Sequence, residues 1–182
     1  IYLIAAEIIK HSDGKVDEKT IEIYINACQR NTILTIGELW AVPIMIRIAL
    51  IENISRVVQG IVFAQKEIKS GELAADKIVD AIYDNKLEEA INEIRILRGM
   101  DYNSHFVSSF LKSLRDNSVE NQTVYQWIDK ELERKNTNAD SIINLEYQKQ
   151  ASCEILMGSC ITGIRETANM NWRVNFEKFS VV

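Results

Sequence analysis

The chain has 182 residues, which is long enough for one domain with a substantial core. Its formal net charge is −5 and both signs are mixed along the sequence, which argues against a nucleic-acid partner because such a partner requires a concentrated basic face. The longest apolar run is interrupted by charges and is shorter than the ~20 residues of a membrane span. We therefore expect no nucleic-acid partner and no membrane span within these residues.

Apolar residues recur at helical spacing along the whole chain, and no segment alternates strictly as a half-buried strand would. The sequence therefore predicts an all-α fold, a single multi-helix domain over residues 1–182. Because residue 1 opens directly into a helical pattern, we expect this domain to be a fragment of a longer chain. The expected helices cover residues 1–11, 18–30, 36–68, 75–82, 87–97, 106–114, 124–132 and 140–168.

The segment 36–68 is the most apolar and contains the only proline, so we expect it to be the central helix. Thr35 and Glu38 match the T-x-x-E capping box, which places the helix start near Ile36. Pro43 lies about two turns further on, where it removes a backbone donor, and this predicts a kink. Glycine commonly follows a helix, so the pair Ser70–Gly71 predicts the end of the central helix.

Small residues occur inside the last expected helix. Gly158 and Gly163 each cost ~1 kcal/mol relative to alanine, which predicts a packing or bending reason for them. The three cysteines lack zinc-binding spacing, and Cys153 and Cys160 lie about 10 Å apart by helical rise. We expect reduced, packed thiols, no metal and no cofactor.

Catalytic signatures are missing from the sequence. His11 near Asp13 lacks a second nitrogen or sulfur ligand, and His105 has no ordered serine and aspartate partners. The chain has neither a glycine-rich phosphate loop nor the Asp-x-Asp pair that many sugar-nucleotide transferases use. The sequence therefore predicts no catalytic residue in this fragment.

Polar side chains interrupt the apolar central helix. Glu52 stands four residues before Arg56, the favourable order for a helical ion pair. One interpretation is the solvated edge of a buried helix, with Arg47 paired to a carboxylate from elsewhere. The other is a polar groove that meets a ligand or a neighbouring domain, and its residues would be Glu38, Trp40, Arg47, Glu52 and Asn53.

A second cluster of polar and aromatic residues lies near the carboxyl end of the chain. It contains Arg165, Trp172 and Arg173, the last two directly after the break at residues 169–171. These residues either form a packed corner or contribute to binding or to an interdomain contact.

Two stretches resemble the amino-terminal region of cyclic β-1,2-glucan synthases, which are membrane glycosyltransferases. The first is LTIGELWAVPIMIRIALIEN, preceded by YLIAAEIIKHSDGKVD and YINACQ. The second is EYQKQASCEILMGSCITGIRETANMNWRVNFEKFSVV, in which Tyr147, Gly163 and Asn171 stand where the family pattern has histidine, serine and aspartate. Both stretches occur in the family's order, whereas residues 61–102 have no counterpart.

The resemblance implies a parent enzyme that polymerises glucose from UDP-glucose and closes the chain into a ring. Catalytic residues would then lie outside this chain. The region would be an accessory helical domain on the cytoplasmic side of the bacterial inner membrane. Its partners would be other domains of the parent chain and the growing β-1,2-glucan.

Two other functions remain open from the sequence. One is a self-sufficient helical protein-interaction module in which the central helix is simply the core. The other is the helical domain of a soluble carbohydrate-active enzyme. A membrane span or a sugar-nucleotide domain later in the reading frame would distinguish the glucan synthase from both alternatives.

Overall fold

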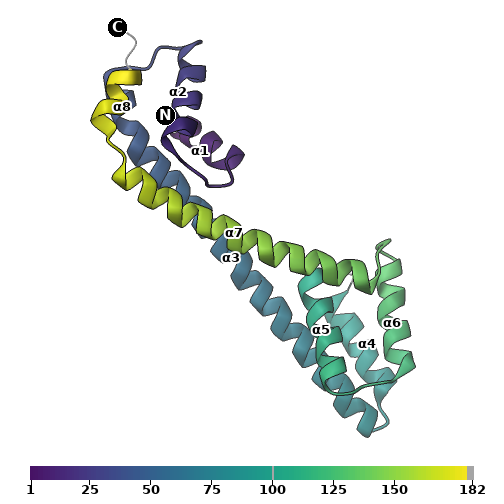
Figure 1. Cartoon of the computed structure of the whole chain (residues 1–182). Coiled ribbons are helices and arrows are strands. Elements are labelled where there is room, and N and C mark those ends of the chain that lie inside the picture. The colour runs from purple at the N-terminus through teal and green to yellow at the C-terminus, as the bar shows by residue number, and fades with distance from the viewer. Residues whose placement is uncertain (100, 180–182) are drawn as a thin grey trace. The chain divides into compact units, whose positions relative to one another are not determined.

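The computed structural model describes residues 1–99 and 101–179, and within these ranges it contains eight helices and no strand (Figure 1). The predicted all-α fold is thus confirmed. Residues 180–182, which end the second resembling stretch, lie outside the described part. The helices are α1 (Tyr2–His11), α2 (Glu18–Gln29), α3 (Ile36–Tyr83), α4 (Leu87–Arg98), α5 (Ser104–Asp116), α6 (Gln122–Glu133), α7 (Ala139–Asn169) and α8 (Trp172–Phe179).

Contacts within the chain fall into two compact units. Unit 1 comprises Ile1–Gln59 and Ser152–Val182, and unit 2 comprises Gly60–Ala151. The long helices α3 and α7 each contribute residues to both units. Each unit has its own apolar core, so the two are described separately.

Unit 1 contains α1, α2, α8 and parts of α3 and α7, and side chains cap the starts of α2 and α3. The Asp17 side chain accepts a hydrogen bond of 2.7 Å from the Thr20 amide at the start of α2. The Thr35 amide donates to the Glu38 carboxylate at 2.8 Å, which closes the predicted capping box at the start of α3. The core is mostly aliphatic, with Ile8, Ile25, Ile46 and Leu50 among its fully buried side chains.

A close backbone approach holds α7 against the turn between α1 and α2. A Cβ added at Gly163 would lie 2.8 Å from the Gly14 carbonyl oxygen. A Cβ at Gly14 would meet the Cys160 sulfur at 2.6 Å, and Gly14 also has a φ of +75°. The predicted packing reason is therefore confirmed for Gly163, whereas Gly158 faces open space.

Unit 2 is built around aromatic side chains from α5 and α6. Phe106 stacks on Phe110 with ring centroids 5.9 Å apart, and Trp127 meets Phe110 edge to face at the same separation. Tyr102 closes the cluster against Phe106 and Trp127. Aliphatic residues of α3 and α4, such as Ile78 and Ile94, complete this core.

The predicted end of the central helix at Ser70–Gly71 is wrong, because α3 continues to Tyr83. Gly71 has a packing function instead of a terminating one. A Cβ there would lie 2.5 Å from the Phe106 carbonyl oxygen and 3.0 Å from the Phe110 amide nitrogen. The absence of a side chain at Gly71 lets α5 approach α3. The helix expected at residues 75–82 is not separate, because these residues form the last part of α3.

Other features of the helices match the expectations. Asn85, with a φ of +58°, turns the chain between α3 and α4, in the gap between the helices expected at 75–82 and 87–97. All three cysteines are free. Pro43 lies inside α3 and the kink there remains a prediction. Among the described residues, no helix is long and apolar enough to cross a membrane.

Candidate functional site

Trp40 is one of the predicted binding residues, and it lies on the surface of unit 1. Its side chain is 59% exposed, although it belongs to the most apolar stretch of the sequence. Its ring packs at 4.9 Å from the ring of Phe176, and Phe176 in turn lies 5.9 Å from Trp172. Trp40 is therefore a surface residue and does not belong to the core of unit 1.

Trp40 and Phe176 line a groove between α3 and α8, which we call the aromatic groove. Its volume is about 290 Å³. Arg173 and Glu177 stand at its rim with their side chains 4.0 Å apart. An exposed tryptophan beside charged hydrogen-bonding groups can stack on an apolar ring face, while the charged groups bind the polar edge of that ring. The lining residues are Ile36, Leu39, Trp40, Arg173, Phe176 and Glu177.

Arg47 and Trp172 meet at one backbone oxygen of α7. The Arg47 guanidinium donates to the Thr167 carbonyl at 3.0 Å, and the Trp172 indole N–H donates to the same oxygen at 2.8 Å. This carbonyl lies in the last turn of α7, where helix carbonyls lack partners within the helix. The expected carboxylate partner of Arg47 is thus replaced by a carbonyl, and Arg47 joins α3 to the end of α7.

Glu52 and Asn53 belong to a different part of unit 1, which we call the polar groove. Its volume is about 490 Å³, and α1 supplies half of its lining residues. The Tyr2 hydroxyl donates to the Glu52 carboxylate, and this hydrogen bond raises the pKa of Tyr2 above its ordinary value. The Asn53 amide donates to the Cys160 sulfur at 3.3 Å. The lining residues are Tyr2, Ala6, Glu7, Ile9, Lys10, Asp13, Glu52, Asn53, Arg56 and Leu156.

The remaining predicted residues have simpler surroundings. Glu38 serves as the capping residue of α3, and the hydrogen bond from the Thr35 amide holds the pKa of its carboxyl below the usual range. Arg165 is an exposed residue of α7. Thus the structure brings Trp40, Trp172 and Arg173 together through Phe176, while Glu52 and Asn53 lie in the polar groove.

Several residues at these sites have no clear sequence signal. Phe176 connects the two tryptophans, but α8 was not predicted from the sequence because this helix has only eight residues. Thr167 contributes through its carbonyl oxygen, which every residue type possesses. The apolar spacing of Trp172, Phe176 and Phe179 is the one signal from which α8 could have been found.

A row of exposed isoleucines also runs along α3 in unit 1. Ile44 and Ile51 are 56% and 58% exposed, and Ile48 lies between them. These residues follow Trp40 at spacings of three or four and therefore share one face of the helix. We call Ile44, Ile48 and Ile51 the isoleucine row. Contiguous exposed apolar side chains are typical of a surface that another protein covers.

Unit 2 contains a polar cluster that the sequence did not indicate. The His105 ring nitrogen Nδ1 lies 2.7 Å from the buried Glu146 carboxylate, and Gln150 donates to the same carboxylate at 3.1 Å. Burial alone would raise the pKa of Glu146, but the hydrogen bonds from His105 and Gln150 outweigh it and the net shift is downward. The contact between His105 and Glu146 joins α5 to α7 within unit 2.

The geometry defines the class of this chain as an all-helical region with surface grooves. Among the described residues, no group of three or more His, Cys, Asp or Glu side chains is placed to hold a metal ion. No family model matches the sequence.

A comparison with known proteins finds a more specific similarity. The chain is 26% identical over 174 residues to the cyclic beta-(1,2)-glucan synthase NdvB of Rhizobium meliloti (strain 1021). The matched region covers 96% of this chain but 6% of that protein, so the chain spans a small part of the relative's length. This similarity supports a distant relationship to the glucan synthase, in agreement with the resemblance seen in the sequence.

Proposed function

We propose that the chain is an accessory helical region of a cyclic β-1,2-glucan synthase-like glycosyltransferase. In this proposal it packs against the transferase and positions that domain and the growing glucan. The catalytic residues lie elsewhere in the parent protein. The similarity to NdvB over 96% of the chain carries the proposal, because it includes nearly all of both units.

The isoleucine row supports the packing part of this proposal. Ile44, Ile48 and Ile51 place apolar side chains in solvent on one face of α3. Burying such side chains gains roughly 1.5–3 kcal/mol each when they are fully covered. The remainder of the parent chain is the proposed partner, and its place is the cytoplasmic side of the bacterial inner membrane.

The aromatic groove supports the glucan-handling part. Glucose rings present apolar C–H faces and hydroxyl edges, which suit an exposed tryptophan beside an arginine and a glutamate. Trp40, Arg173 and Glu177 provide these groups in one groove of about 290 Å³. The proposed ligand is therefore a short segment of linear β-1,2-glucan.

An amide NMR titration tests glucan binding, with linear β-1,2-glucan as ligand and linear β-1,3-glucan as control. We expect saturable shifts around Trp40, Arg173 and Phe176 with the β-1,2-linked chain. Trp40→Ala should abolish these shifts. Tyr147→Ala removes another exposed aromatic side chain, on the unit 2 part of α7, and should leave them unchanged. Equal responses to both glucans, or none at millimolar concentration, would rule out a glucan-selective groove.

A second experiment tests packing in the full-length parent protein. Ile44→Asp combined with Ile51→Asp should lower glucan synthesis or the yield of intact enzyme, because two charges would face the proposed interface. Ile96→Asp, at an exposed position of α4, is the matched control. If both variants behave alike while the isolated chain stays folded, the isoleucine row does not form the proposed contact.

A further inference from the structure

Unit 2 has a groove between α3 and α4 that the proposed function does not use. Its volume is about 430 Å³, and we call it the basic groove. Apolar side chains form most of its surface, while the charged groups at its rim are all cationic. The lining residues are Lys66, Lys69, Ser70, Leu73, Ala74, Lys77, Ile94, Leu97, Arg98 and Phe106.

The floor of the basic groove is fixed by the core of unit 2. Ala74, Ile94 and Phe106 are buried, and Phe106 stacks on Phe110 below. Leu73 and Leu97 stand above the floor and are 60% and 79% exposed. The small side chains of Ser70 and Ala74 leave space between them, so the groove can receive apolar side chains from a partner.

The cations at the rim differ in their partners. Lys77 pairs with Glu93, and Arg98 binds the Glu67 carboxylate at 2.5 Å while lying over the Phe106 ring. Lys66 and Lys69 are exposed, and neither has an ion-pair partner among residues 1–99 and 101–179. Two cationic groups therefore remain available beside an apolar floor.

This local positive charge stands out because the chain as a whole carries −5. The other cations of the groove are matched by carboxylates, so the surplus is concentrated at Lys66 and Lys69 on successive turns of α3. Electrostatic complementarity then requires negative charge on the partner, next to a stripe of apolar side chains.

We propose that the basic groove is the docking site of an acidic amphipathic helix. Such a helix lays apolar side chains at i, i+3, i+4 and i+7 into a hydrophobic groove. Its leucines contact Leu73, Leu97 and the floor, and glutamates that flank the stripe reach Lys66 and Lys69. The proposal is independent of glucan binding, since the aromatic groove belongs to unit 1.

Two designed peptides test the docking site with the full chain. The first is an 18-residue helix with leucines at i, i+3, i+4 and i+7 and glutamates beside them. The second has the same leucines with lysines in place of the glutamates. By fluorescence anisotropy we expect the acidic peptide to bind about tenfold or more tightly than the basic one, and its affinity to fall as salt is added.

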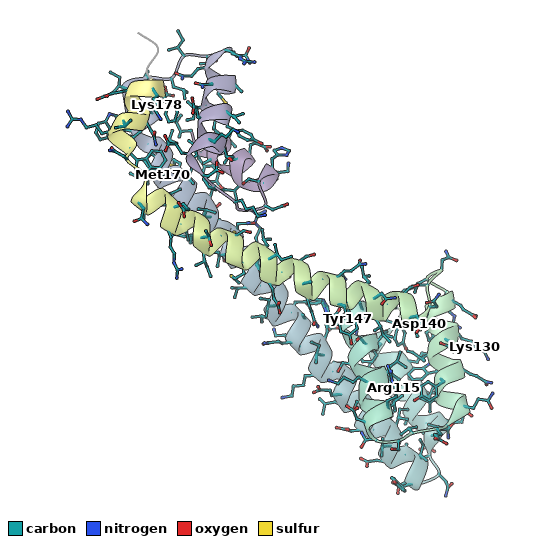
Figure 2. The ribbon with its side chains drawn as sticks, viewed as in Figure 1. Arg115, Lys130, Asp140, Tyr147, Met170 and Lys178 are labelled. Carbon is teal, nitrogen blue, oxygen red and sulfur yellow. The ribbon has the colours of Figure 1, made fainter. Side chains whose placement is uncertain are left out.

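Matched variants locate the interaction. Lys66→Glu combined with Lys69→Glu should weaken binding of the acidic peptide about tenfold, since two rim attractions become repulsions. Lys112→Glu combined with Lys130→Glu makes the same charge change at exposed positions of α5 and α6 and should leave the affinity unchanged (Figure 2 labels Lys130). Circular dichroism confirms that both double variants remain folded.

Three outcomes would overturn the proposal. The acidic peptide fails to bind at 1 mM, both peptides bind equally, or the two double variants lose affinity equally. Vesicles of phosphatidylcholine with 30% phosphatidylglycerol provide a final arm. If these vesicles bind through Lys66 and Lys69 while the acidic peptide does not, the groove serves an anionic membrane surface and the peptide proposal is wrong.

Discussion

The two units differ in the burial of their aromatic clusters. In unit 2, Phe106, Phe110 and Trp127 are buried and packed on one another, so they hold the unit together. In unit 1 the core is mostly aliphatic, and Trp40 is largely exposed beside Phe176. A buried aromatic cluster stabilises a fold, whereas an exposed one is available to a ligand. The comparison separates an aromatic cluster that stabilises unit 2 from a tryptophan that unit 1 leaves on its surface.

The largest expected loss of stability comes from a substitution in the aromatic core of unit 2. Phe110→Ala removes a fully buried ring and should lower the free energy of unfolding by about 3–5 kcal/mol. Chemical denaturation followed by circular dichroism measures the change. Tyr83→Ala, at an exposed position near the end of α3, should change stability by less than about 0.5 kcal/mol. Similar effects of the two substitutions would contradict the assignment of the core.

The next prediction concerns close packing in unit 2. Gly71→Ala places a methyl group against the Phe106 carbonyl and should cost about 1–3 kcal/mol by overpacking. Gly60→Ala is the matched control, because a Cβ at Gly60 meets nothing within 4 Å, and it should stabilise α3 by up to ~1 kcal/mol. Thermal unfolding of both variants measures whether Gly71→Ala lowers the melting temperature while Gly60→Ala raises it.

Unit 1 offers the same comparison on α7. Gly163→Ala brings a methyl group within 2.8 Å of the Gly14 carbonyl oxygen and should destabilise the chain by about 1–3 kcal/mol. Gly158→Ala faces open space and should stabilise by up to ~1 kcal/mol. A stabilising Gly163→Ala would show that α7 does not approach the α1–α2 turn this closely.

We expect the stability of unit 2 to depend on pH through the ionisation of Glu67. The hydrogen bond from Arg98, and a second one from Asn103, hold the pKa of the Glu67 carboxyl below its ordinary value of 4.5. Its stabilising contribution is therefore complete above pH 4.5 and is lost as the pH falls through the lower folded pKa. Glu67→Gln should cost about 2 kcal/mol at pH 7 and progressively less under acidic conditions.

Urea denaturation between pH 7 and pH 3 measures this difference. Glu72→Gln, at an exposed position one turn further along α3, is the control and should show no such convergence. A constant difference between wild type and Glu67→Gln at all pH values would exclude the ionised pair as its cause.

The smallest predicted effect concerns the shared Thr167 carbonyl in unit 1. Arg47→Leu and Trp172→Phe each leave one donor on that oxygen and should each cost about 1 kcal/mol. The double variant leaves the carbonyl without either donor and should cost more than the sum of the two. A double-mutant cycle measures the coupling, and strict additivity would show that the two donors act separately.

Features encoded by local chemistry were predictable from the sequence. Asp17, Thr35 and Glu38 cap helices through contacts within three residues, so the starts of α2 and α3 could be read directly. Gly71 could not, because a glycine that ends a helix and one that admits a neighbouring helix look alike in sequence. The Phe106 carbonyl, 35 positions away, distinguishes them.

The candidate site was predicted in part for the same reason. Trp40, Trp172 and Arg173 stood out as aromatic and charged residues in unusual places, and they do border or support one groove. Their meeting depends on Phe176 and on a backbone oxygen of Thr167, which have no distinctive residue pattern. Tertiary contacts decided which of the predicted residues lie together.

The division of the chain has a consequence for folding during synthesis. Residues 60–151 form an uninterrupted segment. All of unit 2 is therefore available for folding once residue 151 has emerged from the ribosome. Unit 1 is split, and contacts such as the ion pair of Glu18 with Lys178 connect residues 160 positions apart (Figure 2 labels Lys178). Closing such a long loop is slow. The core of unit 1 therefore stays incomplete until α7 and α8 have been translated.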